Sequence, residues 1–236
     1  MTRARIATWT GGAIAGFLAF ALARGDHRVW AYMVVTAVLV SCTYLVDRRV
    51  HFTPPMLAVL CGSMVLHLSG GLLPGVDVEI MYDQWLIPGV LKYDQLVHFV
   101  ISAGLALGCF TIVRRWLKPG IALAGPAFAA AAMAVGLGAV NEIFEFLAGL
   151  AVHDLDVGGY DNTGWDLVFD LAGALSAATW LALSARPKVD DVADREGAMP
   201  AASERDDEVP VRVDVDRVAF DRLVGQLDAD RSPERR

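Results

Sequence analysis

The chain has 236 residues, of which 55% are apolar and 20% are charged, and its formal net charge is -7. The charge is unevenly placed, because residues 185–236 hold 10 of the 20 Lys and Arg and 14 of the 27 Asp and Glu. This division excludes a soluble enzyme, a secreted disulfide scaffold and a basic nucleic-acid binder, and it indicates a membrane domain followed by a polar tail. The three cysteines lie inside apolar runs, where no disulfide framework is expected.

Six apolar runs, each about 20 residues long and nearly free of charge, predict an all-α polytopic membrane protein. They cover residues 6–23, 29–46, 56–73, 95–113, 126–147 and 163–185. The expected fold is a bundle of six transmembrane helices that occupies residues 1–185. Pro54 and Pro55 precede the third run, and Asp161, Asn162 and Thr163 offer N-caps for the sixth.

The first run has two interpretations. Two arginines precede it and small residues end it, as in a cleaved signal peptide, whereas its 18-residue length favours a retained helix. Two motifs of small residues, Gly12-x-x-x-Gly16 and Gly104-x-x-x-Gly108, predict positions where helices approach closely. Such motifs describe packing and carry no functional information.

The distribution of Lys and Arg between the loops predicts the orientation of the bundle. With a cytoplasmic N-terminus, the inner side receives Arg3, Arg5, Arg48, Arg49, Arg114, Arg115, Lys118, Arg186 and Lys188, and the outer side receives Arg24, Arg28 and Lys92. Nine basic residues against three satisfy the positive-inside rule, so both termini are expected in the cytoplasm. The loops on the expected outer side are rich in acidic residues.

Residues 186–236 form the expected cytoplasmic tail. Large apolar residues are scarce up to position 208, which predicts a mostly disordered segment. Beyond it, Val215, Val218 and Leu223 fall on one helical face, so the sequence favours a short amphipathic helix near 214–228. That helix either forms only transiently or docks a cytoplasmic partner, and both alternatives stay open.

Ionisable residues interrupt the last three apolar runs, and charges embedded in a membrane are costly and commonly functional. They form pairs three or four residues apart, which places each pair on one helix face. The pairs are Asp94 and His98, Glu142 and Glu145, and Asp166 and Asp170, with Asp161 just before the last pair. The alternation of the spans puts all of them at the outer end and at similar depths, so one polar site is expected there. His67, near the outer end of the third run, is a further candidate member.

Buried carboxylates at this depth cost on the order of several kcal/mol unless something compensates their charge. Protonation, a divalent cation, a cationic ligand or a water-filled cavity would each do so, and no Lys or Arg lies within these runs. The residues most suited to a metal are His98, Glu142, Glu145 and Asp170. Histidine with carboxylates suits zinc, manganese or iron, whereas carboxylates alone suit magnesium or calcium. Asp94 and Asp161 have an alternative role as helix caps, and Asp166 has one as a first-turn residue.

Around these residues the sequence resembles a known family. The segments that carry the resemblance are Tyr93-Asp94-x-x-x-His98-Phe99, Glu142-x-x-Glu145 and Tyr160-Asp161-x-x-x-Trp165-Asp166-x-x-x-Asp170-x-x-Gly173. They resemble the YjdF family of bacterial inner-membrane proteins, whose function is not established. The layout is also similar, more distantly, to VanZ-like proteins, which are associated with glycopeptide-antibiotic resistance and tend to show Gln and Asn where this chain has Glu145 and Asp170. The resemblance implies a bacterial inner-membrane location and a shared site, and it supplies no reaction.

Three functions stay open. The first is an intramembrane enzyme in which the acidic residues and His98 hold a divalent cation that acts on a lipid-linked or headgroup substrate at the outer leaflet. The second is a small transporter coupled to protons or cations. The third is a non-catalytic membrane factor that binds a cationic ligand or recruits a partner through its tail. The expected partners are membrane lipid and a cytoplasmic partner for the tail, and the charge pattern excludes nucleic acid.

Overall fold

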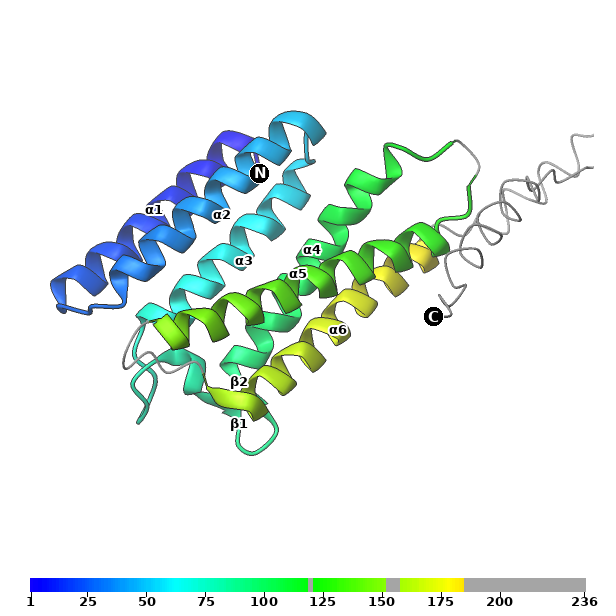
Figure 1. Ribbon diagram of the computed structural model, residues 1–236. Coiled ribbons are helices and arrows are strands. Elements are labelled where there is room, and N and C mark those ends of the chain that lie inside the picture. The colour runs from blue at the N-terminus through cyan, green and yellow to red at the C-terminus, as the bar shows by residue number, and fades with distance from the viewer. Residues whose placement is uncertain (119–120, 152–157, 185–236) are drawn as a thin grey trace, which may run out of the picture. The chain divides into compact units, whose positions relative to one another are not determined.

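Long helices make up most of the described chain, which in this computed structural model comprises residues 1–118, 121–151 and 158–184. The six helices are α1 (Arg3–Ala23), α2 (Val29–Val50), α3 (Pro54–Leu72), α4 (Tyr93–Arg114), α5 (Ala124–Ala151) and α6 (Gly159–Ser184) (Figure 1). Each contains a stretch that is long and apolar enough to cross a membrane. The expected all-α, six-helix membrane architecture is therefore confirmed.

The chain divides into two units, Met1–Arg186 and Pro187–Arg236, and the second unit lies outside the described residues. The predicted tail, including its amphipathic segment near 214–228, is therefore not described by the structure and stays a prediction.

The helices begin and end a few residues away from the apolar runs, because backbone hydrogen bonding continues past the last apolar side chain. Pro54 and Pro55 do not precede α3 but form its first turn, where a missing backbone N–H leaves no hydrogen bond unmade. The expected caps of α6 are wrong. The helix begins at Gly159, so Asp161 lies in its first turn and Asn162 and Thr163 follow inside the helix.

The segment between α3 and α4 is more ordered than the acidic loop expected from the sequence. A short 3-10 helix, η1 (Met81–Asp83), leads into an antiparallel hairpin of β1 (Trp85–Ile87) and β2 (Leu91–Lys92). Gly89 in the turn has a φ of 69°, which a residue with a side chain adopts with difficulty. The hairpin runs directly into α4 and therefore determines where that helix starts.

Small side chains hold α4, α5 and α6 together. Their shared core consists mainly of alanines, with Cys109 and Phe110 of α4 as the larger members. α4 and α6 also meet at Gly173, where an added Cβ would overlap the backbone carbonyl of Phe99. This close approach is typical of helix pairs in membranes, where small residues let backbones come together.

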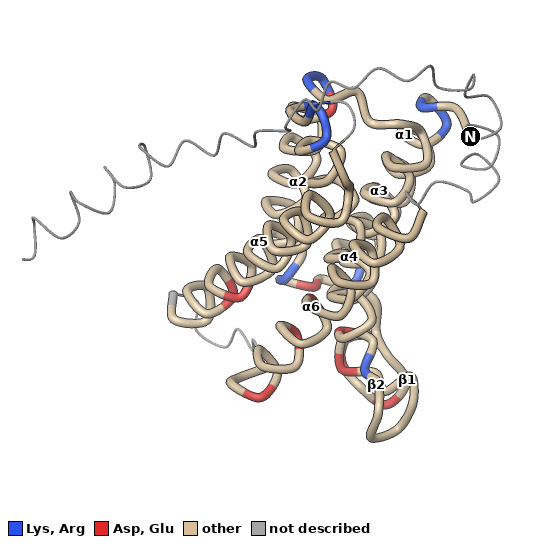
Figure 2. The backbone as a smooth tube through the Cα atoms, turned by 90° about the vertical axis from the view of Figure 1, so that its right-hand side faces the viewer, with Lys and Arg blue, Asp and Glu red and all other residues tan. Residues whose placement is uncertain are grey.

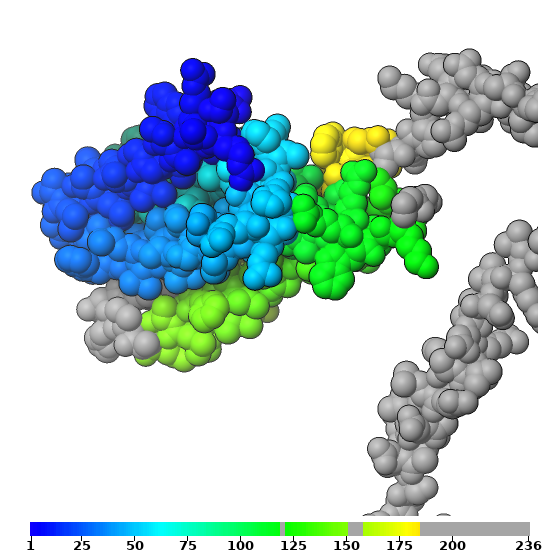
Figure 3. Space-filling model, turned by 90° about the horizontal axis from the view of Figure 1, so that it is seen from above, coloured from blue at the N-terminus to red at the C-terminus, as the bar shows by residue number. Residues whose placement is uncertain are grey.

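Among the first three helices, α3 makes the main contacts. It packs against α1 and against α4. Figure 3 shows α1 and α2, in blue, side by side on one flank of the molecule. The motif Gly104-x-x-x-Gly108 faces α3, where an added Cβ on Gly104 would lie 3.1 Å from Val59. In contrast, Gly12 and Gly16 face open space within the described residues. Only the second glycine motif therefore marks a close helix contact.

The two ends of the bundle differ in charge. Figure 2 shows Lys and Arg gathered where α1 begins and α2 ends. There, Arg3 pairs with Asp47 and donates to the Phe52 carbonyl oxygen at 2.5 Å, and Arg115 donates to the carbonyl oxygen of Arg49 at 2.9 Å. The opposite end, where α4 and α6 begin and α5 ends, carries the hairpin and most of the acidic residues that the structure describes.

Candidate functional site

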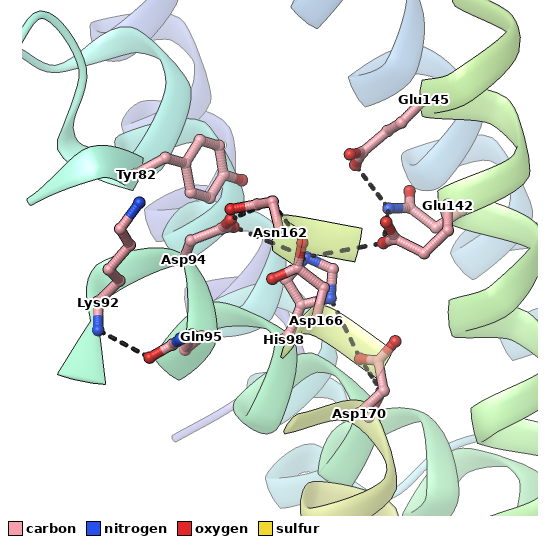
Figure 4. A network of polar contacts seen from close by, with 12 residues as sticks. Tyr82, Lys92, Asp94, Gln95, His98, Glu142, Glu145, Asn162, Asp166 and Asp170 are labelled. Carbon is pink, nitrogen blue, oxygen red and sulfur yellow. Dashed lines mark hydrogen bonds and ion pairs between the residues drawn. The ribbon is translucent and has the colours of Figure 1, made fainter. Parts of the chain in front are cut away.

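A histidine on α4 lies among acidic side chains from three helices (Figure 4). α4 supplies Asp94 and His98, one helical turn apart, α5 supplies Glu142, and α6 supplies Asp166 and Asp170. The residues meet because α4 and α6 begin at the end of the bundle where α5 finishes. The fold thus brings together polar pairs that lie far apart in the sequence.

The two ring nitrogens of His98 face different carboxylates. Nδ1 lies 3.3 Å from Asp170 Oδ1, within hydrogen-bonding distance. Nε2 lies 3.7 Å from Asp94 Oδ1, 3.9 Å from Asp166 Oδ1 and 4.0 Å from Glu142 Oε1. These last three separations are too long for direct hydrogen bonds. With Asp170 accepting a hydrogen bond from Nδ1–H, a neutral imidazole presents the Nε2 lone pair to three acidic oxygens, and a protonated one presents an N–H.

Asp170 is held firmly in place. Only 1% of this residue is exposed, and its Oδ1 accepts a 2.6 Å hydrogen bond from the hydroxyl of Ser102, which is fully buried. α5 contributes Gly138 at this point, and an added Cβ on Gly138 would overlap Oδ2 of Asp170. Ser102 and Gly138 therefore fix the carboxylate that orients His98.

An amide from α6 orients two of the acids that face Nε2. The side-chain nitrogen of Asn162 donates to Asp166 Oδ2 at 2.5 Å and to Asp94 Oδ2 at 3.2 Å. Asn162 thus occupies one oxygen of each carboxylate and leaves the Oδ1 atoms toward His98. A neutral donor between two like charges lowers their repulsion without adding a charge of its own.

A second amide links the two glutamates of α5. The side-chain nitrogen of Asn141 donates to Glu145 Oε1 at 2.7 Å and lies 3.5 Å from Glu142 Oε1. Among the described residues, this is the hydrogen bond that joins Glu145 to the group. Glu145 therefore belongs to the edge of the site and not to the ring of acids around His98.

Three carboxylate oxygens of this group are buried without a hydrogen-bond partner among the described residues. They are Glu142 Oε2, Asp166 Oδ1 and Asp170 Oδ2. The part of the chain that the structure describes pairs no Lys or Arg with any of these three acids. Enclosed carboxylate oxygens are unfavourable when nothing binds them, so protons, water or a cation must complete the group.

The residues fit a divalent cation. One ligand atom from each of Asp94, His98 and Asp166 lies within 4.8 Å of the other two. Tetrahedral coordination with metal–ligand distances of about 2.1 Å separates ligand atoms by about 3.4 Å, so the distances from Nε2 are only a few tenths of an ångström wider. An imidazole nitrogen with carboxylate oxygens suits zinc, manganese or iron.

The geometry favours a different set of metal ligands from the one expected from the sequence. Asp170 Oδ1 lies beside Nδ1, on the other side of the ring from the oxygens that face Nε2. Glu145 reaches the group through Asn141. Asp94 and Asp166 lie closer to Nε2 and are the better candidate ligands. From the sequence alone, Asp94 could also have been a helix cap and Asp166 a first-turn residue. Asp94 lies in the first turn of α4 and is not its N-cap.

Asp161 lies apart from the other acids. It is exposed in the first turn of α6, and the described residues give it no ion pair or hydrogen bond with the group around His98. Together with Tyr160, Gly164, Trp165 and Val168 it lines a hollow of about 230 Å³ on a different face of α6. The structure therefore does not bring Asp161 into the site.

Sequence reasoning did not identify the parts that Ser102, Asn162 and Gly138 play in the site. Two of them are uncharged polar residues and the third has no side chain, so none interrupts an apolar run conspicuously. Helical spacing could have found two of them, since Ser102 lies four residues after His98 and Asn162 four residues before Asp166. Gly138 gives no such signal, because its role depends on which helix faces it.

His67 lies beside this group and contacts Tyr82, which belongs to the segment that follows α3. Its Nδ1 is 2.6 Å from the hydroxyl of Tyr82, which also donates to the His67 carbonyl oxygen at 3.0 Å. Burial raises the pKa of Tyr82 well above its ordinary value, and the nearby Asp94 and Glu145 add to the rise. The phenol therefore stays protonated at neutral pH, next to Asp94 in Figure 4.

Comparison with known proteins places the chain among membrane proteins of unassigned activity. Residues 6–187 match the model of a family described as "Predicted membrane protein (DUF2238)", which is the YjdF-like family. Nothing in the comparisons supports the more distant likeness to VanZ-like proteins. No curated protein and no solved structure matches the chain.

Proposed function

We propose, from the geometry around His98, that this chain, which belongs to the YjdF-like family of membrane proteins (DUF2238), is a metal-dependent enzyme of the membrane. In this proposal, Nε2 of His98 and the Oδ1 atoms of Asp94 and Asp166 hold a divalent cation, with Glu142 at the edge. The substrate is lipid-linked or is a lipid headgroup. The site lies toward one end of three helices that are long enough to cross a membrane, so in this proposal it faces the headgroups of one leaflet.

The observation that carries this proposal is the environment of His98. Asp170 occupies Nδ1, and three acidic oxygens face Nε2 at 3.7–4.0 Å. Metal-binding histidines commonly donate their other ring N–H to a carboxylate, which fixes the tautomer and the orientation of the ring. A lone pair that faces anions is repelled by them, whereas a cation between the lone pair and the oxygens is attracted to both.

In this proposal, a substrate reaches the group from its exposed side. The side chains of Asp94 and His98 are 15% and 13% exposed, whereas Asp166 and Asp170 are closed off. A substrate oxygen would therefore arrive beside Asp94. A bound divalent cation supplies Lewis acidity there. The chain's own residues orient the imidazole through Asp170 and Ser102, and Asn162 links the carboxylates of Asp94 and Asp166.

We place this site on the outer face of a bacterial inner membrane, with both termini in the cytoplasm. The gathering of Lys and Arg at the opposite end of the bundle supports this orientation. The partners in this proposal are membrane lipid at the acidic end and a cytoplasmic protein for the tail.

A turnover assay on reconstituted protein tests the proposal. The purified chain is placed in vesicles of phosphatidylethanolamine and phosphatidylglycerol, and the release of headgroup or phosphate is measured before and after removal of metal by EDTA. We expect release that EDTA abolishes and added Mn²⁺ or Zn²⁺ restores. His98→Ala should abolish it, and Asp161→Asn should not, because Asp161 lies on the same helix as Asp166 but outside the group.

Other results would support the other two functions and contradict the enzyme. Movement of protons or cations across the vesicle wall without release would indicate a transporter. Binding of a cationic ligand with neither release nor flux would indicate a non-catalytic membrane factor.

A further inference from the structure

Glu142 has one carboxylate oxygen more than the proposed cation site uses. Its Oε1 lies 4.0 Å from His98 Nε2, whereas Oε2 is buried and has no hydrogen-bond partner among the described residues. The residue as a whole is 6% exposed, so bulk water does not solvate this oxygen freely. An enclosed carboxylate oxygen of this kind indicates a ligand of its own.

Glu145 lies on the same face of α5 as Glu142. It follows Glu142 by three residues on α5, and Figure 4 shows both carboxylates pointing from the helix toward the side where Asp94 and His98 lie. Asn141 lies against Oε1 of each glutamate, at 2.7 Å from Glu145 and 3.5 Å from Glu142. Oε2 of Glu142 has no hydrogen-bond partner among the described residues. The two glutamates lie on adjacent turns of one helix face.

The charge of the group exceeds what one divalent cation balances. Five acids lie in or beside it, namely Asp94, Glu142, Glu145, Asp166 and Asp170. Ser102, Asn141 and Asn162 donate hydrogen bonds to them and bring no positive charge. With all five acids ionised and His98 neutral, one divalent cation leaves three negative charges close together in a poorly solvated region, where uncompensated charge is most costly.

We propose that Glu142 and Glu145 hold a second divalent cation, and that the Glu142 carboxylate bridges it to the cation beside His98. This inference rests on the proposed function, because the bridge needs a cation at the His98 site. Oxygen ligands alone suit Mg²⁺ or Mn²⁺, which bind through one or two carboxylates, retained waters and substrate phosphate oxygens. Paired cations about 3.5–4 Å apart act on the attacking and leaving oxygens of a phosphoryl group, so the substrate class is a phosphate ester of a lipid.

The number of Mn²⁺ ions bound by each chain tests this inference. The full-length protein in detergent is freed of metal, titrated with Mn²⁺ alone by equilibrium dialysis, and examined by electron paramagnetic resonance. We expect two ions per chain and the spectrum of a spin-coupled pair. Glu145→Gln should bind one ion with an uncoupled spectrum, whereas the control Asp161→Asn should keep two coupled ions.

The possible outcomes separate this inference from the proposed function. One ion per wild-type chain, lost in His98→Ala, would overturn the second site and leave the first intact. No bound ion in a folded wild-type sample would overturn both. Two coupled ions in Glu145→Gln would overturn the assignment of Glu145. If Glu145→Gln does not purify as a folded protein, Glu145→Asp replaces it, and affinity for the second ion should then fall at least tenfold because its carboxylate is drawn back toward the helix.

Discussion

Asp166 and Asp170 lie on the same face of α6, one turn apart, yet they meet different nitrogens of His98. The difference comes from their neighbours. Ser102 and Gly138 fix Asp170 against Nδ1, while Asn162 holds Asp166 on the side of Nε2. Two acids of the same type therefore have different roles. Asp170 positions the imidazole, and in our proposal Asp166 binds the cation.

Asp170→Asn tests the positioning role. The amide keeps the size of the side chain but holds His98 Nδ1–H less strongly and no longer stabilises the imidazole by its charge. We expect affinity for Zn²⁺ or Mn²⁺ to fall about 10- to 100-fold without complete loss, as for other residues that orient a metal ligand. Equilibrium dialysis measures this, with Asp161→Asn as the unchanged control. Complete loss of binding would instead indicate that Asp170 is itself a ligand.

Gly138→Ala tests the close contact behind Asp170. The added Cβ would overlap the Asp170 carboxylate, so α5 or Asp170 has to move, and we expect a loss of about 1–3 kcal/mol in the free energy of unfolding. Gly136→Ala is the matched control, since a Cβ there meets nothing within 4 Å and alanine favours a helix. Melting temperatures in detergent compare the two variants. Equal stability of both would contradict the contact.

At this scale the sequence predicted the residue types of the site better than their roles. Spacing places His98 and the paired acids on helix faces at one end of the bundle, because each helix has a fixed rise and turn. It does not reveal which ring nitrogen meets which carboxylate, because that depends on side-chain rotamers and on neighbours from other helices. Asp170 and Glu145 were therefore expected as ligands, whereas the geometry favours Asp94 and Asp166.

The helices themselves were predictable, because about 20 apolar residues in succession are a strong signal. The contacts between the helices were harder to predict. Gly104-x-x-x-Gly108 marks a close approach to α3, whereas Gly12-x-x-x-Gly16 faces open space, although the two motifs read alike. The hairpin before α4 was missed because its strands are only three and two residues long.

The turn between α1 and α2 provides a prediction about pH. Asp26 accepts hydrogen bonds from the Arg28 side chain, two of them at 2.9 Å, and this interaction lowers the pKa of Asp26 below its ordinary value. A carboxylate with a lowered folded-state pKa stabilises the fold above its unfolded pKa of about 3.9, and this contribution is lost as the pH falls through the folded value.

We therefore expect Asp26→Asn to be less stable than the wild type by about 1–2 kcal/mol at pH 7, with a smaller difference at about pH 3. Melting temperatures in detergent at the two pH values measure the difference. A difference of the same size at both values would show that the charge of Asp26 does not stabilise this turn.

The helical bundle that the structure describes has a basic end and an acidic end, and this asymmetry was visible in the sequence. Lys and Arg cluster at the start of α1 and at the ends of α2 and α4, and the site lies at the other end. The positive-inside rule then supports an orientation with cytoplasmic termini and an outward-facing site.

Cysteine labelling in intact cells tests this orientation. In a chain whose own three cysteines are replaced, Val90→Cys lies on the exposed hairpin and Ser203→Cys lies in the tail. We expect a membrane-impermeant maleimide to label Val90→Cys in intact cells and Ser203→Cys only after the cells are permeabilised. The opposite pattern would reverse the topology and place the site in the cytoplasm.

Elemental analysis of the purified protein tests whether the acids around His98 hold a divalent cation. We expect at least one zinc, manganese or iron atom per wild-type chain and per Asp161→Asn chain, and none above background in a folded His98→Ala sample. A folded wild-type protein without bound metal, and with none taken up when Mn²⁺ or Zn²⁺ is added, would show that these acids do not form a cation site.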